Sequence, residues 1–322
     1  MGDITYIQAI NQALREELRR DPRTFLIGID VRLGIFGATV GLVDEFGPER
    51  IRNAPISEAG YTGAGVGAAL AGMHPIVEIE FASFFYCAWD QVCNQAAKLR
   101  YMSGGQADMP ITFRTVYGAL GQAAAQHSET VYGQFLSVPG LKIVVPSGPY
   151  DMKGLLKSAI RDNNPVLVFE HMGLGRSKEA VPDEEYVVPL GKAAVKREGK
   201  DVTVVAIGLM VSKALAAAKA LEKDGISVEV VDPRTLVPLD EETILNSVAK
   251  THKVLIVDEG HLRGGAAADI AAIIADKGFD SLDGPIKRLA APDVPVPFSP
   301  PMEQFVVPSN EKIVAAVKEL VG

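Results

Sequence analysis

The chain has 322 residues, of which 48% are hydrophobic, enough to fill the cores of two domains. Its formal net charge of −8 excludes the basic surface that binds nucleic acid. We find no secretory signal and no apolar run long enough to cross a bilayer, so we expect a soluble cytoplasmic protein without a membrane partner.

The first part of the chain alternates strand-like and helix-like segments, which predicts a parallel sheet covered by helices. The predicted strands are Thr24–Ile29, Pro75–Ile79, Ile111–Thr115, Leu141–Val145 and Pro165–Phe169, and the predicted helices are Tyr6–Arg19, Gly63–Ala71, Trp89–Tyr101 and Pro149–Arg161. This pattern predicts one doubly wound α/β domain over residues 1–185.

Between Ser177 and Lys200 the periodicity weakens and charged residues and proline accumulate, which predicts a domain boundary after residue 185. Over residues 186–322 the alternation resumes and predicts a second, smaller doubly wound α/β domain. Its predicted elements are Val202–Ile207, Ala214–Leu221, Ser227–Val231, Glu241–Ser247, Lys253–Val257, Gly265–Ala275, Ile286–Leu289 and Asn310–Leu320. The proline-rich stretch Ala291–Pro301 is expected to lie extended, either as a subunit contact or as a stiff loop.

Glu58 stands where a loop leads into a helix made almost wholly of Gly and Ala. Such a helix lets neighbouring backbone approach closely, so its first carboxylate is expected in a tight, partly dry setting suited to proton exchange. The alternative is that Glu58 only caps the helix N-terminus, where negative charge is favoured. The glycines do not predict a nicotinamide site, because no hydrophobic strand precedes them.

Aromatic residues crowd the segment that follows the second predicted strand, with Phe84 among them. Rings at the carboxyl end of a parallel strand are well placed to stack on a flat ligand. Packing between helix and sheet is the simpler interpretation for any one of them. The two cysteines, Cys87 and Cys93, are spaced for neither a disulfide nor a metal clip and are expected to be buried, reduced thiols.

His127 lies in a loop of small residues after the strand that ends near Thr115. Loops at the carboxyl ends of strands carry reactive groups in α/β folds, and a histidine there can exchange protons near neutral pH. On these residues alone, a structural hydrogen-bonding role is equally compatible. The turn 161–165 offers oxygen ligands that suit a hard cation, although a plain Asn-Pro turn explains it as well.

Taken together, these segments resemble the beta subunits of the decarboxylating component of 2-oxo acid dehydrogenase complexes, a transketolase-like family. The resemblance runs from about Ile4 to Leu320 and includes the pyruvate, branched-chain 2-oxo acid and acetoin dehydrogenases. The motifs that carry it are Pro55–Gly60, Ala96–Gly105, Gln126–Ser128, Pro139–Lys142 and Ala159–Pro165. It implies a pyrimidine-binding domain followed by a transketolase C-terminal-like domain.

The resemblance implies specific roles for several residues. Glu58 would hydrogen-bond the pyrimidine ring of thiamine diphosphate and so activate the coenzyme, Phe84 would stack on that ring, and Cys87 would lie beside it. His127 would handle protons during acyl transfer to a lipoyl group. A structural potassium site, formed mostly by backbone oxygens, would comprise Ile111, Ala159, Asp162 and Asn164.

The resemblance also implies partner proteins. The chain contains no Gly-Asp-Gly motif of the kind that holds magnesium and diphosphate in such enzymes. An alpha subunit would supply that grip in an α2β2 heterotetramer, and a lipoyl-bearing acyltransferase would accept the acyl group from a small 2-oxo acid.

Three positions depart from the family pattern. Ser137 stands where a second histidine is usual, Tyr132-Gly133 replaces a commoner Glu-Ala pair, and Cys87 replaces a glutamine. These departures leave the 2-oxo acid and the acceptor undetermined. A subunit of a split transketolase and a non-catalytic scaffold are the alternatives, which the scarcity of histidines and the retained Glu58 respectively disfavour.

Overall fold

The computed structural model describes residues 2–119 and 121–322, which form two compact units. The first comprises the chain up to Tyr117 together with Ser137–Leu190, and the second comprises Gly118–Leu136 and Gly191–Gly322. Within the described residues, no helix is both long and apolar enough to span a membrane.

The first unit is built on a parallel sheet with the strand order β6-β7-β5-β4-β2-β3. Its strands are β2 (Thr24–Gly28), β3 (Ile51–Asn53), β4 (His74–Phe81), β5 (Thr112–Tyr117), β6 (Lys142–Val144) and β7 (Val166–His171). A short antiparallel pair, β1 (Gly2–Thr5) with β8 (Lys178–Val181), lies outside this sheet. The central strands β5 and β7 are buried along almost their whole length, as expected for a sheet covered on both faces.

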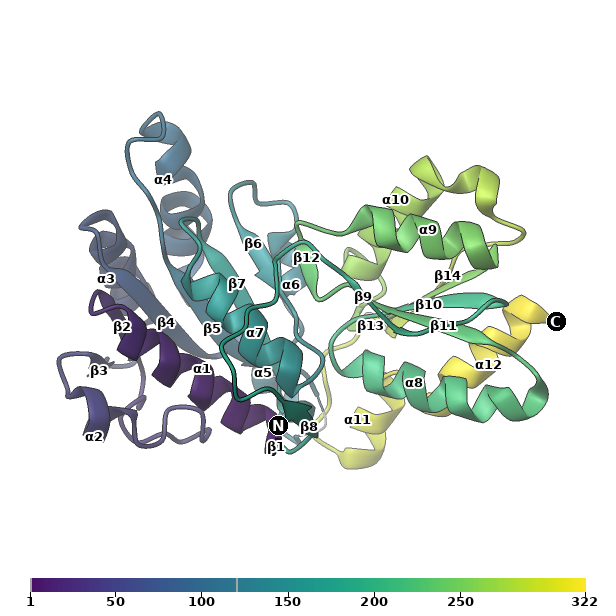
Figure 1. The fold of residues 1–322 in the computed structure, drawn as a ribbon, viewed down its shortest axis with the longest axis horizontal. Helices are drawn as coiled ribbons and strands as arrows, with labels where there is room; N and C mark the ends of the chain where they lie inside the picture. Colours follow the sequence, from purple (N-terminus) through teal and green to yellow (C-terminus); the bar gives the residue numbers. More distant parts are fainter. Residues whose placement is uncertain (1, 120) are drawn as a thin grey trace. The chain divides into compact units, whose positions relative to one another are not determined.

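Two groups of helices cover this sheet. Helix α1 (Tyr6–Arg20) packs along α7 (Pro149–Ile160), as Figure 1 shows, and the capping box at Thr5 and Gln8 fixes where α1 begins. Helix α3 (Glu58–Leu70) packs instead against β4, the 3₁₀ helix η1 (Ala82–Ala88) and the π-helix η2 (Gln91–Ala96). The shorter helices of this unit are α2 (Leu42–Phe46), α4 (Ala97–Met102) and η3 (Met172–Leu174).

The second unit has its own sheet, in the order β14-β13-β10-β11-β9. The strands are β9 (Ala194–Arg197), β10 (Val202–Ala206), β11 (Val228–Asp232), β13 (Val254–His261) and β14 (Lys287–Ala291), and only β9 runs antiparallel to its neighbour. Helices α8 (Leu209–Leu221) and α12 (Asn310–Val321) lie on one side of the sheet, and α9 (Glu241–Thr251) and α10 (Ala266–Lys277) on the other (Figure 1). The remaining elements of this unit are α5 (Ala124–Ser128), α6 (Tyr132–Phe135), η4 (Glu222–Asp224), β12 (Thr235–Val237), η5 (Phe279–Ser281) and α11 (Pro300–Val306).

The predicted fold class, two doubly wound α/β domains, is confirmed. Several element boundaries differ from the predicted ones. The helix predicted over Gly63–Ala71 begins five residues earlier, at Glu58. The single helix predicted over Trp89–Tyr101 contains the π-helix η2 and the α-helix α4, and it directly follows η1. Part of the proline-rich stretch was predicted wrongly as extended, because Pro300 and Pro301 occupy the first turn of α11, where a missing N–H costs nothing.

The division into units differs from the predicted one at two places. The first unit extends beyond the predicted boundary at residue 185, to Leu190, because the residues after 185 are hydrogen-bonded to α7. Ser158 Oγ donates to the Val188 carbonyl at 2.5 Å, and the Val188 amide donates to the Gly154 carbonyl at 3.2 Å. The segment Gly118–Leu136 belongs with the second unit. Its Ala119 and Gln122 amides donate to the carboxylates of Glu259 (2.5 Å) and Glu303 (3.2 Å), respectively. These partners lie far along the chain, so no local sequence pattern predicts the contacts.

Candidate active site

The start of helix α3 places Glu58 at a half-enclosed position. Glu58 is the first helical residue and is only 8% exposed, whereas the preceding Ile56 is 84% exposed. The N-cap is Ser57, so Glu58 is not the capping residue itself, although its charge still favours the helix N-terminus. Gly65 on the buried face brings the helix close to β4, because a Cβ there would lie 2.6 Å from the Val77 side chain. The close packing predicted from the Gly-Ala composition is therefore present.

Two further carboxylates lie near Glu58. Asp30 follows β2 in a left-handed conformation (φ 51°), and Glu80 is near the carboxyl end of β4. Burial raises the pKa of Glu80, and the negative charges of Asp30 and Glu58 raise it further. Among the residues described, none of these three carboxylates has an ion-pair or hydrogen-bond partner from a side chain. An acidic region without counter-charge therefore lies at the carboxyl edge of the sheet.

The aromatic segment divides into core and rim. Phe85 is fully buried, with its ring 6.2 Å from Phe113, so core packing is the right interpretation for that residue. Phe84 is half-buried and meets Phe81 edge to face at 5.6 Å between ring centroids. Phe81 in turn meets Phe36 at 5.5 Å. Phe84 thus belongs to a partly exposed aromatic cluster that can meet a flat ligand.

The two cysteines have different environments. Cys93 is buried, and burial raises the pKa of its thiol to about 11, as predicted for a reduced core cysteine. Cys87 is exposed at the end of η1, so the prediction that it is buried is wrong. It is close enough to Glu58's helix to influence the electrostatics of Tyr61 there.

His127 lies in the second unit, on the short helix α5, and is half-buried. The backbone before it is strained, because Gln122 and Ala124 adopt positive φ angles of 53° and 59° that non-glycine residues seldom adopt. Such strain is typical of functional loops held by their surroundings. Glu58 and His127 belong to different units.

The predicted cation turn is closed by its own side-chain contacts. The Asp162 carboxylate pairs with Lys142 and accepts hydrogen bonds from the Asn164 amide and side chain, both at 2.9 Å. The Ile111 carbonyl accepts one amide at 3.0 Å and keeps a second lone pair, whereas the Ala159 carbonyl accepts the Asp162 amide at 3.2 Å and also the Arg161 amide. A cation here would therefore depend on main-chain oxygens. No cluster of three acidic, His or Cys ligands for a metal occurs among the residues described.

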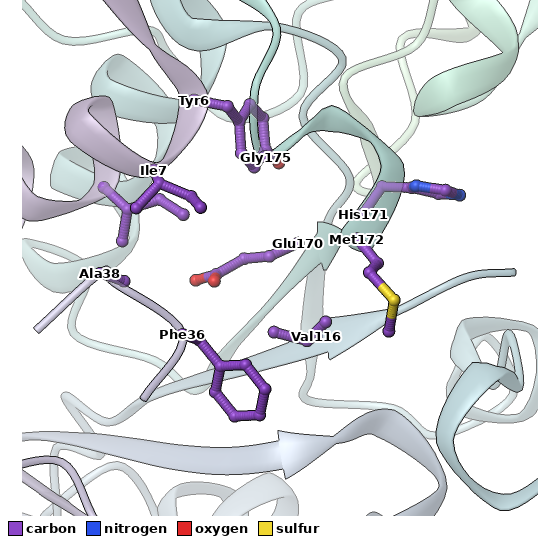
Figure 2. Close-up of a pocket in the computed structure, with 10 residues that line it drawn as sticks. Tyr6, Ile7, Phe36, Ala38, Val116, Glu170, His171, Met172 and Gly175 are labelled. Carbon is purple, nitrogen blue, oxygen red and sulfur yellow. The ribbon is translucent and has the colours of Figure 1, made fainter. Parts of the chain in front are cut away.

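A buried charge cluster on the adjacent strands β4, β5 and β7 was not predicted. Arg114 donates to both carboxylate oxygens of Glu170 at 2.8 Å and also pairs with Glu78. Figure 2 shows the Glu170 carboxylate directed into a cavity of about 90 Å³ that Phe36 and Val116 help to line. Cross-strand neighbours of this kind follow from strand register, which one sequence does not give.

Comparison with known proteins agrees with this architecture. Residues 2–178 match the family model described as transketolase, pyrimidine binding domain, and residues 191–313 match the transketolase C-terminal domain. A solved structure described as a split gene transketolase, inactive beta4 tetramer, superposes with a TM-score of 0.82 at 25% identity, covering 99% of both chains.

Relatives of similar length are more alike in sequence. The beta subunit of the acetoin:2,6-dichlorophenolindophenol oxidoreductase of Bacillus subtilis is 51% identical, covering 99% of this chain and 97% of that one. The 2-oxoisovalerate dehydrogenase and pyruvate dehydrogenase E1 beta subunits of the same organism are 49% and 45% identical, with 99% of both chains covered. The chain therefore belongs to the transketolase-like family of dehydrogenase beta subunits, with a pyrimidine-binding domain followed by a transketolase C-terminal domain.

Proposed function

We propose that this chain is the beta subunit of a thiamine-diphosphate-dependent 2-oxo acid dehydrogenase and is active only with an alpha subunit. The observation that carries the proposal is the buried Glu58 at the first turn of α3, within a pyrimidine-binding domain whose full-length relatives are such subunits. Thiamine diphosphate, when bound, supplies the nucleophile and the electron sink for decarboxylation of a 2-oxo acid.

The residues of this chain fit the aminopyrimidine part of that coenzyme. Glu58 is screened from water yet lies at the open end of its helix, so its carboxyl group can hold a proton at a ring nitrogen. Phe84 offers a ring for stacking, and Cys87 is exposed on the same 3₁₀ helix. His127, on its strained loop, is proposed to move protons during transfer of the acyl group to a lipoyl carrier.

Magnesium and the diphosphate are assigned to the alpha subunit. Among the residues described, this chain has no cluster of acidic, His or Cys ligands for a divalent ion. In an α2β2 assembly the alpha subunit would supply these ligands. We also propose a potassium site at Ile111, Ala159, Asp162 and Asn164, formed mostly by main-chain oxygens. Replacing potassium by tetramethylammonium should then lower the thermal midpoint of the complex, and an unchanged midpoint would remove the site.

A defined assay tests the activity. The chain is co-expressed with its alpha subunit, supplied with thiamine diphosphate and magnesium, and given pyruvate or 2-oxoisovalerate with an artificial electron acceptor. Carbon dioxide release coupled to reduction of the acceptor is expected. Two-carbon transfer between sugar phosphates would instead indicate a split transketolase, and coenzyme binding without turnover would indicate a scaffold.

Acetoin is a second candidate substrate. One relative that is 51% identical carries acetoin oxidoreductase in its name, slightly above the 49% and 45% of the two 2-oxo acid dehydrogenase subunits. Cleavage of acetoin uses the same coenzyme chemistry, so both candidate functions require Glu58 and differ only in the pocket that binds the substrate. Adding acetoin to the assay separates them by the ratio of kcat/KM values.

A further inference from the structure

A buried tyrosine hydroxyl without a partner lies next to Glu58. Tyr61 is 4% exposed, and among the residues described its hydroxyl forms no hydrogen bond. Buried tyrosine hydroxyls usually have a hydrogen-bond partner, because a buried polar group without a hydrogen bond costs about 1–3 kcal/mol. The hydroxyl of the half-buried Tyr186, by contrast, donates to the Tyr150 carbonyl at 2.9 Å. The exception at Tyr61 requires an explanation.

The position of Tyr61 connects it to the acidic region. It follows Glu58 by three residues on α3, so both side chains lie on one face of the helix. That helix packs against β4, which carries Glu80 near its end, and against η1, which carries Cys87. Burial raises the pKa of Tyr61 well above its ordinary value, and the charges of Glu58, Glu80 and Cys87 raise it further, in that order.

We propose that the Tyr61 hydroxyl is a coenzyme-binding group that hydrogen-bonds the nitrogen-bearing edge of the heterocycle seated at Glu58. This inference rests on the proposed function and adds a residue to it. A ring that carries nitrogen and amino groups presents polar atoms to the phenol as well as to the carboxylate. Binding of the coenzyme would thus give the Tyr61 hydroxyl the hydrogen bond that it lacks in the free chain. A phenylalanine at this position could not contribute to affinity in this way.

The variant Tyr61→Phe tests this directly, because it removes one oxygen and keeps the ring. In the complex with the alpha subunit, the dissociation constant for thiamine diphosphate at fixed magnesium should rise about five- to tenfold. Without coenzyme, the thermal midpoint of the same complex should stay unchanged or rise, since the lost hydroxyl had no partner. Tyr186→Phe is the matched control, for which the midpoint should fall and the dissociation constant should not change.

Two results would overturn the inference. One is a wild-type dissociation constant for Tyr61→Phe. The other is a lowered midpoint without coenzyme, which would mean that the hydroxyl is satisfied within the free protein, for instance by a buried water. If Glu58→Gln weakens binding while Tyr61→Phe does not, only the role of Tyr61 fails. If the wild-type complex does not bind thiamine diphosphate at all, the proposed function fails and the role of Tyr61 fails with it.

Discussion

The first unit holds two groups of buried or half-buried acidic residues that differ in one respect. Glu78 and Glu170 share the guanidinium of Arg114, which donates to Glu170 through two bonds of 2.8 Å. Near them, Glu58 and Glu80 have no cation paired to them among the residues described. Because both carboxylates share one buried guanidinium, this cluster is expected to stabilise the fold.

The carboxylates without a paired cation can still accept hydrogen bonds from a ligand, but keeping them unpaired lowers the stability of the fold. Glu80 is held near Glu58 and Asp30, and this proximity together with burial disfavours its charged form. Groups kept in this state are characteristic of sites that bind or react, because a ligand can satisfy what the free protein does not. Missing partners, rather than buried charge as such, distinguish the candidate site from the Arg114 cluster.

The largest expected effect concerns the paired group. Arg114→Met leaves two carboxylates buried without a counter-charge and should lower the free energy of unfolding by about 3–5 kcal/mol. Urea denaturation of the chain measures the loss. Arg19→Met, which removes an exposed partner of Glu45, is the control and should leave the midpoint in place. If both variants unfold alike, the paired cluster does not stabilise the fold.

A smaller effect is expected at the aromatic rim. Phe84→Leu removes a ring that is half-buried beside Phe81 and should weaken binding of thiamine diphosphate by the complex up to about tenfold, the value of one stacked pair. Titration calorimetry gives the constant. Phe279→Leu, at a site 69% exposed in the second unit, should not change it. Equal constants for Phe84→Leu and wild type would remove Phe84 from the site.

The smallest expected effect is a pH-dependent change in stability when Glu80, one of the unpaired carboxylates, is replaced. The pKa of Glu80 is raised above its ordinary 4.5 in the folded chain, so its charged form destabilises the fold above that folded pKa, and the cost disappears below pH 4.5. Glu80→Gln should therefore stabilise the chain by a few tenths of a kcal/mol at pH 7.5, since solvent screens a half-buried group.

The gain from Glu80→Gln should vanish as the pH falls to 4.5 and below. Denaturant midpoints of the variant and the wild type, measured across this range, give the difference. A gain that is constant with pH, or a loss at pH 7.5, would show that Glu80 is not an unpaired acid.

Much of the fold could be predicted from the sequence, because buried parallel strands are apolar runs separated by helical periodicity. Boundaries failed where the backbone departs from ideal geometry, as in η1 and η2, or where distant residues decide, as for residues 118–136. Glu58 could be singled out by its place before a Gly-Ala helix. Tyr61 was missed although its three-residue spacing from Glu58 was visible, because only the structure shows that its hydroxyl lacks a partner.

The Arg114 cluster was missed for a different reason. Arg114 is separated from Glu78 by 36 residues and from Glu170 by 56. Their contact depends on the order β4-β5-β7 and on a register that places Glu78 opposite Arg114. Local patterns do not contain that order, so charged residues inside predicted strands gave no indication of which partners they would meet.

The most direct test of the account replaces one oxygen of Glu58. Glu58→Gln keeps the size of the side chain but removes its ability to hold and release a proton at the ring nitrogen. In the reconstituted complex, coenzyme-dependent turnover of the preferred substrate should fall at least about a hundredfold, with the unfolding midpoint unchanged. Turnover equal to that of the wild type would contradict the assignment of Glu58 and, with it, the proposed function.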